Sequence, residues 1–315
     1  MKELREPQRP RTTKSPLENH IESFLIQADI KPKTKETYRK SLRAFFNFLA
    51  DERVNDPQKE NIVAFKEKLQ DEGKKATTIQ TYLIAIKVFF NYLDSEMLYR
   101  NIAQNVKNVR IEKNHKKDFL SVGECKELLQ SIDQNTLKGA RDYAIISLML
   151  TCGLRTVEIA RANIEDIKSL NGQKVLYVQG KGRDEKSEYV KINPNVYGSI
   201  QKYLMKRLEQ HPQTAQKEPL FSSTSNNNSN GRITTRALRE LVKKHLRRID
   251  LDSERLTAHS LRHTSATLNL LNGGTLEETQ QLLRHTNINT TMIYVHTLER
   301  LKNQSENRIA SAIFE

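Results

Sequence analysis

The chain has 315 residues, and its 52 Lys and Arg residues against 38 Asp and Glu give a formal net charge of +14 at pH 7. With 2 cysteines and no apolar run near the roughly 18 residues of a membrane span, the composition excludes disulfide-rich mini-proteins, four-cysteine zinc fingers and helical membrane proteins. The length predicts two domains of about 150 residues each. Residues 1–117 carry a net charge of +8 and residues 118–315 one of +6, which favours a polyanion held between two domains.

The first domain is predicted to be an all-α bundle over residues 16–103. Residues 1–15, which precede it, are polar and basic, so we expect a disordered basic tail and no secretory signal peptide. Within the domain, large apolar residues recur at helical spacing in three segments, 36–49, 60–70 and 77–93.

The second domain, residues 118–297, is predicted to be mainly α with a small antiparallel β-sheet, an α+β fold. A polar, basic linker over residues 104–117 is expected before it. Two short β-rich segments, 174–179 and 188–192, flank a charged loop and predict a β-hairpin. Residues 222–231, rich in Ser and Asn, predict a mobile surface loop. Helices are expected at residues 121–131, 142–151, 196–210, 234–249, 260–271, 276–284 and 290–296.

Two cationic residues in this domain lie where the predicted local structure would fix the position of their side chains. A predicted apolar helix ends at Gly153, and Arg155 follows two residues later with Glu158 three residues further on. This pattern indicates either a placed cation with its orienting carboxylate or an ordinary surface ion pair. Lys181 lies between two glycines in the hairpin loop, where the backbone could approach a ligand closely, although most lysines in such turns are simply solvated.

Two further groups carry histidine and tyrosine side chains. His259 and Arg262 are three residues apart at a predicted helix start, so they share a face that could bind phosphate or transfer protons. The alternative is a polar helix start with structural histidines. His285 precedes a short predicted helix that carries Tyr294, and a tyrosine on a half-apolar helix is more often a core residue than a nucleophile.

In chain order these side chains form the series Arg, Lys, His-x-x-Arg, His, Tyr, which resembles the tyrosine recombinase (integrase) family of phage integrases and Xer-type resolvases. The surrounding segments CGLRTVEIA, GKGRDEK, HSLRHTSAT and RHTNINTTMIYVH are similar to the family as well. The resemblance covers residues 18–300. Two departures are Arg284, where the family commonly has Gly, and the long polar stretch 222–231. The matching residues are Arg155, Lys181, His259, Arg262, His285 and Tyr294.

The resemblance implies a SAM-like core-binding domain followed by a catalytic domain that cleaves and rejoins DNA through a 3′-phosphotyrosine. Arg155 and Arg262 would grip the non-bridging oxygens of the phosphate, since guanidinium groups match them in forked geometry. Tyr294 would attack the phosphorus.

The remaining assignments also come from the resemblance. His259 would take the tyrosine proton, Lys181 would protonate the leaving 5′-hydroxyl, and His285 would hydrogen-bond the phosphate or the tyrosine. The sequence alone leaves open which of His259 and Lys181 acts as base and which as acid. No metal ion and no cofactor is implied.

The expected partner is double-stranded DNA, bound by a homotetramer on two duplexes in the cytoplasm, with accessory DNA-bending proteins as further partners. The resemblance implies that residues 298–315 form a helix exchanged between protomers, whereas the alternative is a helix folded back on its own domain. Phosphate contacts, which position the protein rather than specify sequence, are expected from a list of basic residues. These are Lys31, Lys33, Lys35, Arg39, Lys40, Lys113, Lys116 and Lys117.

Two other functions remain open at this point. One is a DNA-binding architectural or regulatory protein with the same fold, which the complete set of six residues disfavours. The other is a relaxing enzyme of the type IB topoisomerase kind, which shares the tyrosine chemistry. For a recombinase, the biological role would be plasmid or chromosome dimer resolution, or integration and excision of a mobile element.

Overall fold

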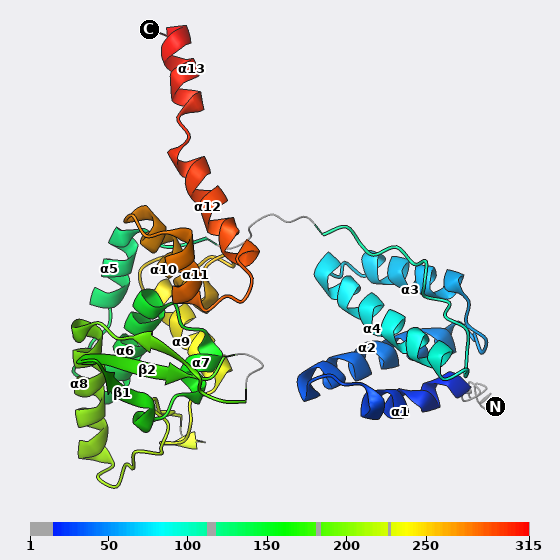
Figure 1. Ribbon diagram of the computed structural model, residues 1–315, viewed down its shortest axis with the longest axis horizontal. Helices are drawn as coiled ribbons and strands as arrows, with labels where there is room; N and C mark the ends of the chain where they lie inside the picture. The colour runs from blue at the N-terminus through cyan, green and yellow to red at the C-terminus, as the bar shows by residue number, and fades with distance from the viewer. Residues whose placement is uncertain (1–14, 112–117, 181–183, 226–227, 315) are drawn as a thin grey trace, which may run out of the picture. The chain divides into compact units, whose positions relative to one another are not determined.

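The structure is a computed structural model of the protein, and it describes residues 15–111, 118–180, 184–225 and 228–314. The chain divides into two compact units, residues 1–114 and residues 115–315. Each unit has a hydrophobic core of its own. The described part of the amino-terminal unit is helical and the carboxy-terminal unit adds a small antiparallel sheet, which confirms the predicted fold class (Figure 1).

The amino-terminal unit is a helical bundle that follows a short 3-10 turn at Pro16–Asn19. Its described α-helices are α1 (His20–Gln27), α2 (Pro32–Asp51), α3 (Lys59–Asp71) and α4 (Ala76–Ser95). The last three confirm the predicted helices, whereas α1 has only 8 residues and was not predicted. Between α2 and α4, the buried rings of Phe46 and Phe89 meet edge-on with centroids 5.8 Å apart. A pair of this kind adds about 0.5–1.5 kcal/mol beyond the area that it buries.

The segment after α4 still packs on the amino-terminal unit. Ile102, Ala103 and Val106 are buried in its core, so the first residues of the predicted linker belong to this unit. The later part of that linker, with Lys113, Lys116 and Lys117, lies outside the described residues, as does the predicted tail up to residue 14.

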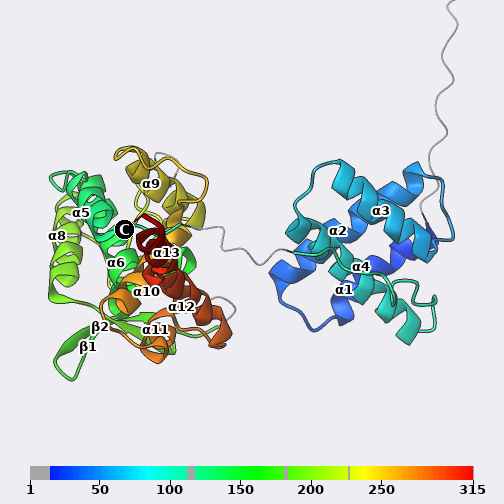
Figure 2. The ribbon, with the colours of Figure 1, turned by 90° about the horizontal axis from the view of Figure 1, so that it is seen from above.

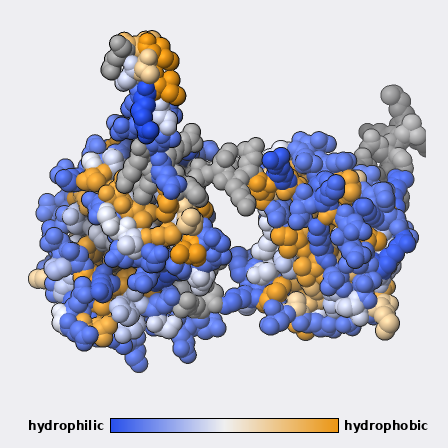
Figure 3. Space-filling model, turned by 45° about the horizontal axis from the view of Figure 1, so that its top comes forward, coloured by the Kyte–Doolittle hydropathy of each residue, from blue (hydrophilic) through white to orange (hydrophobic). Residues whose placement is uncertain are grey.

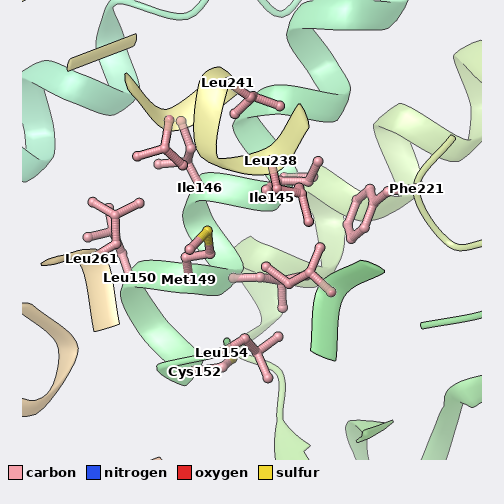
Figure 4. Close-up of a cluster of buried hydrophobic side chains, with 14 of the residues drawn as sticks. Ile145, Ile146, Met149, Leu150, Cys152, Leu154, Phe221, Leu238, Leu241 and Leu261 are labelled. Atoms are coloured by element: carbon pink, nitrogen blue, oxygen red, sulfur yellow. The ribbon is translucent and has the colours of Figure 1, made fainter. Parts of the chain in front are cut away.

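The carboxy-terminal unit surrounds one apolar helix. Its described α-helices are α5 (Val122–Gln130), α6 (Leu137–Cys152), α7 (Thr156–Arg161), α8 (Pro194–Gln210), α9 (Thr235–Arg247), α10 (Ala258–Leu271), α11 (Leu276–Leu283), α12 (Asn289–Lys302) and α13 (Ser305–Phe314). Helix α6 is the central one, because it is apolar on nearly every face and such a helix must be covered all round. It packs against α8 and α10 (Figure 2). In Figure 4 its side chains Ile146 and Met149 lie among Leu241 of α9 and Leu261 of α10.

The sheet has three strands, β1 (Ile167–Leu170), β2 (Gln173–Val178) and β3 (Glu188–Lys191), paired antiparallel in that order. Strands β2 and β3 confirm the predicted hairpin, whereas β1, of 4 residues, was not predicted. The rings of the cross-strand pair Tyr177 and Tyr189 lie 5.8 Å apart. Residues 181–183 of the hairpin loop, which include the predicted site residue Lys181, lie outside the described residues.

The prediction of a mobile loop over residues 222–231 was wrong at both ends of that segment. Ser222 is buried, forms an isolated bridge with Arg232, and its carbonyl accepts a hydrogen bond of 2.9 Å from Arg141. The backbone N–H of Ser223 also donates to the carbonyl of Gly231 at 2.7 Å. Polar composition predicted exposure here, but the hydrogen bonds fix the ends of the segment to the domain.

The carboxyl-terminal helices divide differently from the prediction of one helix over 290–296 and another over 298–315. The helix expected at 290–296 extends to Lys302 as α12, and α13 follows it. Helix α13 buries none of its residues, and Ile309, Ile313 and Phe314 are 58%, 68% and 85% exposed. Figure 3 shows this apolar surface on the last helix of the chain. In this structure α13 is therefore not folded back on its own domain.

Candidate active site

Arg155 is aimed by the way in which α6 ends. Gly153 stops that helix with φ +57°, a left-handed conformation that glycine adopts without strain, and a Cβ there would meet Leu283 Cδ2 at 2.8 Å. Arg155 then becomes the N-cap residue of α7. Its backbone N–H donates to Glu158 Oε2 at 2.8 Å and its Nη1 donates to Oε1 at 2.9 Å. A fully buried carboxylate thus holds both the backbone and the side chain of Arg155, as the predicted pairing requires.

Arg262 lies on α10 and joins three elements. It is 1% exposed and donates to the carbonyls of Gly153, at the end of α6, and Leu283, at the end of α11. Burial, with the nearby charges of Arg155 and Arg284, lowers the pKa of Arg262 to about 9. The guanidinium still carries its charge at neutral pH although it is buried.

A chain of aromatic rings connects α10 to the candidate nucleophile. The rings of His259 and His263, one turn apart on α10, have centroids 4.5 Å apart, and His263 lies 5.3 Å from the ring of Tyr294 on α12. Tyr294 is 4% exposed, and burial raises its pKa to about 12 against the opposing charges of Arg262 and Arg155. His263 is not among the predicted site residues, although its i,i+4 spacing from His259 on one helix face could have indicated it.

His285 lies two residues after the end of α11 and contacts Thr291 of α12. Its Nδ1 lies 3.0 Å from Thr291 Oγ1. Burial, followed by the charges of Arg262, Arg155 and Arg284, lowers the pKa of His285 to about 4. The imidazole is therefore neutral at pH 7, and with Nδ1 directed at Thr291 it can act as a hydrogen-bond donor or acceptor rather than as a cation.

These side chains open on a cavity of about 390 Å³. Four of the six predicted residues line it, and Tyr294 reaches the same cluster through the ring of His263. Gly180 also lines the cavity, so the hairpin loop starts at its wall, while Lys181 itself lies outside the described residues. The lining residues are Arg155, Gly180, Glu188, His259, Arg262, Arg284, His285, Thr286 and Thr290. Guanidiniums and imidazoles around one cavity can bind a phosphate diester and stabilise negative charge as it develops.

Among the residues that the structure describes, no three His, Cys, Asp or Glu side chains gather in a group that could hold a metal ion. None of the described helices combines the length and the apolar composition that crossing a membrane requires.

The predicted DNA-contact residues of the amino-terminal unit lie around α2. Lys33 and Lys40 line a groove of about 530 Å³ together with threonines of α4. Lys33 also pairs with Glu36 at 2.7 Å, and Arg39 donates both Nε and Nη2 to Glu22 at 2.8 Å. Of the other two predicted contact residues, Lys31 is exposed, and Lys35 donates a hydrogen bond to the carbonyl of Ile26 at 3.5 Å.

Comparisons with known proteins match both units. Residues 118–300 match the model of the phage integrase family, and residues 17–97 match its N-terminal SAM-like domain. Tyrosine recombinase XerC of Thermodesulfovibrio yellowstonii is 30% identical over 285 residues, which cover 88% of this chain and 89% of the relative. XerC of Caldanaerobacter subterraneus subsp. tengcongensis is 36% identical over 203 residues, 64% of this chain, and the match spans about half of that relative, 53%.

Solved structures share the fold. The XerH site-specific recombinase bound to its palindromic difH substrate in a post-cleavage complex has a TM-score of 0.71 at 22% identity, covering 95% of this chain and 85% of that one. The Tn1549 transposon integrase in complex with a circular intermediate DNA has a TM-score of 0.69 at 16% identity, covering 90% and 95%.

Proposed function

The chain belongs to the phage integrase family of tyrosine recombinases, and we propose that it recombines DNA at specific sites with Tyr294 as its nucleophile. The observation that carries this proposal is the cavity into which Arg155, Arg262 and His285 converge from separate elements, with the ring of Tyr294 in the same cluster. The complete set argues against an architectural protein, because DNA binding alone has no need of a buried tyrosine beside two guanidiniums.

The two arginines take the role of binding the scissile phosphate. Forked guanidinium groups can each donate two hydrogen bonds to its non-bridging oxygens and stabilise the charge that builds up as the nucleophile attacks. Hydrogen bonds to the carbonyls of Gly153 and Leu283 hold the side chain of Arg262, so it can bind the phosphate without changing its conformation. Removing one such preorganised donor typically costs about 10²–10³-fold in rate.

The reaction transfers the phosphate to Tyr294. Its hydroxyl gives up a proton to His259, the phenolate oxygen bonds to phosphorus, and the bond from phosphorus to the 5′-oxygen breaks. That oxygen takes a proton from Lys181, which leaves a 3′-phosphotyrosine and a free 5′-hydroxyl. A 5′-hydroxyl from the second duplex reverses these steps and rejoins the strand without ATP, because the covalent intermediate retains the energy of the phosphodiester.

The raised pKa of Tyr294 makes its deprotonation the demanding step. A pKa of about 12 leaves the free enzyme with very little phenolate at neutral pH. Movement of the ring out of its buried position toward the cavity would expose it to Arg155 and Arg262, whose charges lower that pKa. Neutral His285, paired with Thr291, donates a hydrogen bond to the phosphate without adding charge.

The rest of the molecule positions the DNA. The groove beside α2, with Lys33 and Lys40, and the basic residues Lys31, Lys35 and Arg39 contact phosphates of the duplex, together with the linker lysines. The exposed apolar face of α13 docks on a second copy of the chain to form a homotetramer on two duplexes. A lambda integrase structure of the same fold is a tetramer bound to a Holliday junction.

The biological role is either dimer resolution, as the Xer-type relatives favour, or integration and excision of a mobile element. The reaction takes place in the cytoplasm, with accessory DNA-bending proteins as further partners where synapsis requires them. A type IB relaxing enzyme, in contrast, would act on any supercoiled DNA.

The test is covalent trapping in the presence of a metal chelator. Wild type, Tyr294→Phe and the matched control Tyr189→Phe, at a tyrosine 43% exposed on β3, are incubated with nicked DNA from the flanks of the protein's own gene. We expect an SDS-resistant adduct with wild type and the control alone, and the same binding affinity in all three. An adduct in Tyr294→Phe would contradict the nucleophile. Binding without any adduct would favour the architectural alternative, and relaxation of arbitrary plasmids the topoisomerase-like one.

A further inference from the structure

Arg284 stands out among the residues around the cavity because of its backbone. It ends α11 with φ +53°, in the left-handed region that side chains other than glycine rarely adopt. Glycine, which the family commonly has at this position, would take this conformation without strain. A strained arginine at the wall of a catalytic cavity points to a contribution that offsets the strain.

The side chain of Arg284 contacts the same carboxylate that orients Arg155. Its Nη2 donates to Glu158 Oε2 at 2.8 Å, and its Nη1 donates to the carbonyl of Leu282 at 2.7 Å. The side chain is 5% exposed and Glu158 is fully buried. Glu158 is thus shared between two guanidiniums, with Oε1 facing Arg155 and Oε2 facing Arg284.

Arg284 also changes the balance of charge around the cavity. Among the described residues, Arg155, Arg262, Arg284 and Glu188 line the cavity, and Glu158 lies behind its wall, paired with Arg155 and Arg284. With glycine at position 284, Glu158 would have Arg155 as its remaining ion-pair partner. The wall that meets a phosphate diester would then carry one positive charge less.

We propose that Arg284 is a positioning residue for cleavage: its guanidinium neutralises Glu158 and thereby keeps the charge of Arg155 available to the scissile phosphate. This inference rests on the proposed function. It explains why the chain keeps an arginine in a strained conformation directly before His285. Arg284 also adds one positive charge to the described wall of the cavity.

The test uses the full-length protein and single-turnover adduct formation on nicked DNA. Arg284→Met removes the charge, Arg284→Lys keeps the charge without the fork, and Arg236→Met removes an exposed surface arginine as a control for net charge. We expect Arg284→Met to slow cleavage by about 10–100-fold, the range for losing a hydrogen bond to a charged group, with DNA affinity changed by less than about twofold. Arg284→Lys should recover much of the rate, and Arg236→Met should match wild type.

Two further measurements separate this role from a purely structural one. If Arg284 serves to neutralise Glu158, the double variant Glu158→Gln, Arg284→Met should cleave faster than Arg284→Met. A DNA with an uncharged methylphosphonate at the scissile position should also reduce the difference between Arg284→Met and wild type, because a neutral phosphate needs one positive charge less.

The outcomes are distinguishable. A wild-type rate in Arg284→Met, or no recovery in either the double variant or the methylphosphonate DNA, would overturn the role of Arg284 while adduct formation by wild type upholds the recombinase. If wild type forms no adduct, the proposed function fails, and this inference falls with it.

Discussion

Three side chains of the candidate site have pKa values shifted toward their neutral forms. Burial is the largest cause for each: it brings Arg262 to about 9, His285 to about 4 and Tyr294 to about 12. The two basic groups are shifted further by neighbouring arginines, because positive charges crowd together at the cavity. A bound phosphate would supply negative charge and raise the pKa values of Arg262 and His285 back toward ordinary ones.

This shift makes stability depend on pH through His285. Its pKa is about 4 in the folded protein against an ordinary value of 6.5, so between these pH values the unfolded chain binds a proton that the folded chain does not. Lowering the pH from 7 to 5 should therefore lower the free energy of unfolding by about 1 kcal/mol through this group, after discounting for its partial exposure.

Urea unfolding at pH 7 and pH 5 checks this prediction. His285→Gln should lose less stability on acidification than wild type, whereas His20→Gln, on α1 of the other unit, should behave as wild type does. Equal losses in His285→Gln and wild type would show that this histidine does not carry the effect.

At the candidate site the end of α6 contacts or continues into α7, α10 and α11. The carbonyl of Gly153 accepts from Arg262 of α10, and the position of a Cβ on Gly153 is taken by Leu283 of α11. Arg155 then starts α7 two residues later. The geometry of the site is thus set by one helix terminus, and its rigidity comes from the fully covered α6 behind it.

Gly153→Ala tests this junction. The new Cβ would lie 2.8 Å from Leu283 Cδ2 on a backbone with φ +57°, so we expect the carboxy-terminal unit to lose about 2–3 kcal/mol of stability and most of its cleavage rate. Gly172→Ala is the matched control, because it has φ +77° but nothing within 4 Å, and should cost about 1 kcal/mol with cleavage intact. Unfolding curves and adduct yields of both variants measure these effects. Similar losses of stability and of cleavage in the two variants would contradict the tight contact between Gly153 and Leu283.

At the scale of the whole molecule, positive charge is spread over both units rather than gathered in one tail. In the amino-terminal unit several basic side chains already have acidic partners, such as Arg39 with Glu22. Lys33 and Lys40 both line the groove beside α2, and Lys33 pairs with Glu36 at 2.7 Å. Exposed pairs of this kind contribute little to stability, so they can open when a phosphate approaches.

Lys40→Ala should therefore weaken DNA binding at every sequence by a similar factor. The slope of log affinity against log salt concentration should fall in magnitude by about 0.9, the value for one lost phosphate contact. Lys59→Ala, an exposed lysine at the start of α3, is the control with the same change in net charge. Titrations at several salt concentrations measure both slopes, and equal slopes for the two variants would place the duplex away from this groove.

Local patterns were sufficient for the longer elements. Apolar spacing predicted α2, α3 and α4, and β-rich segments predicted the hairpin, because these signals depend on neighbours a few residues away. The short elements α1, α7 and β1, of 8, 6 and 4 residues, were missed. Strand β1 exists through its pairing with β2, which composition does not reveal.

The sequence by itself determined the family and the fold class and predicted which side chains react, because residue types in a fixed order are a local and linear property. Only the tertiary structure decided which of them converge. Arg262 reaches Gly153 across 109 positions of the chain and Arg284 reaches Glu158 across 126. It also decided that Glu158 is shared, that His263 lies beside Tyr294, and that α13 is exposed. Distances, burial and pKa values depend on the packing of elements far apart in sequence, and that packing is a collective result of the whole core.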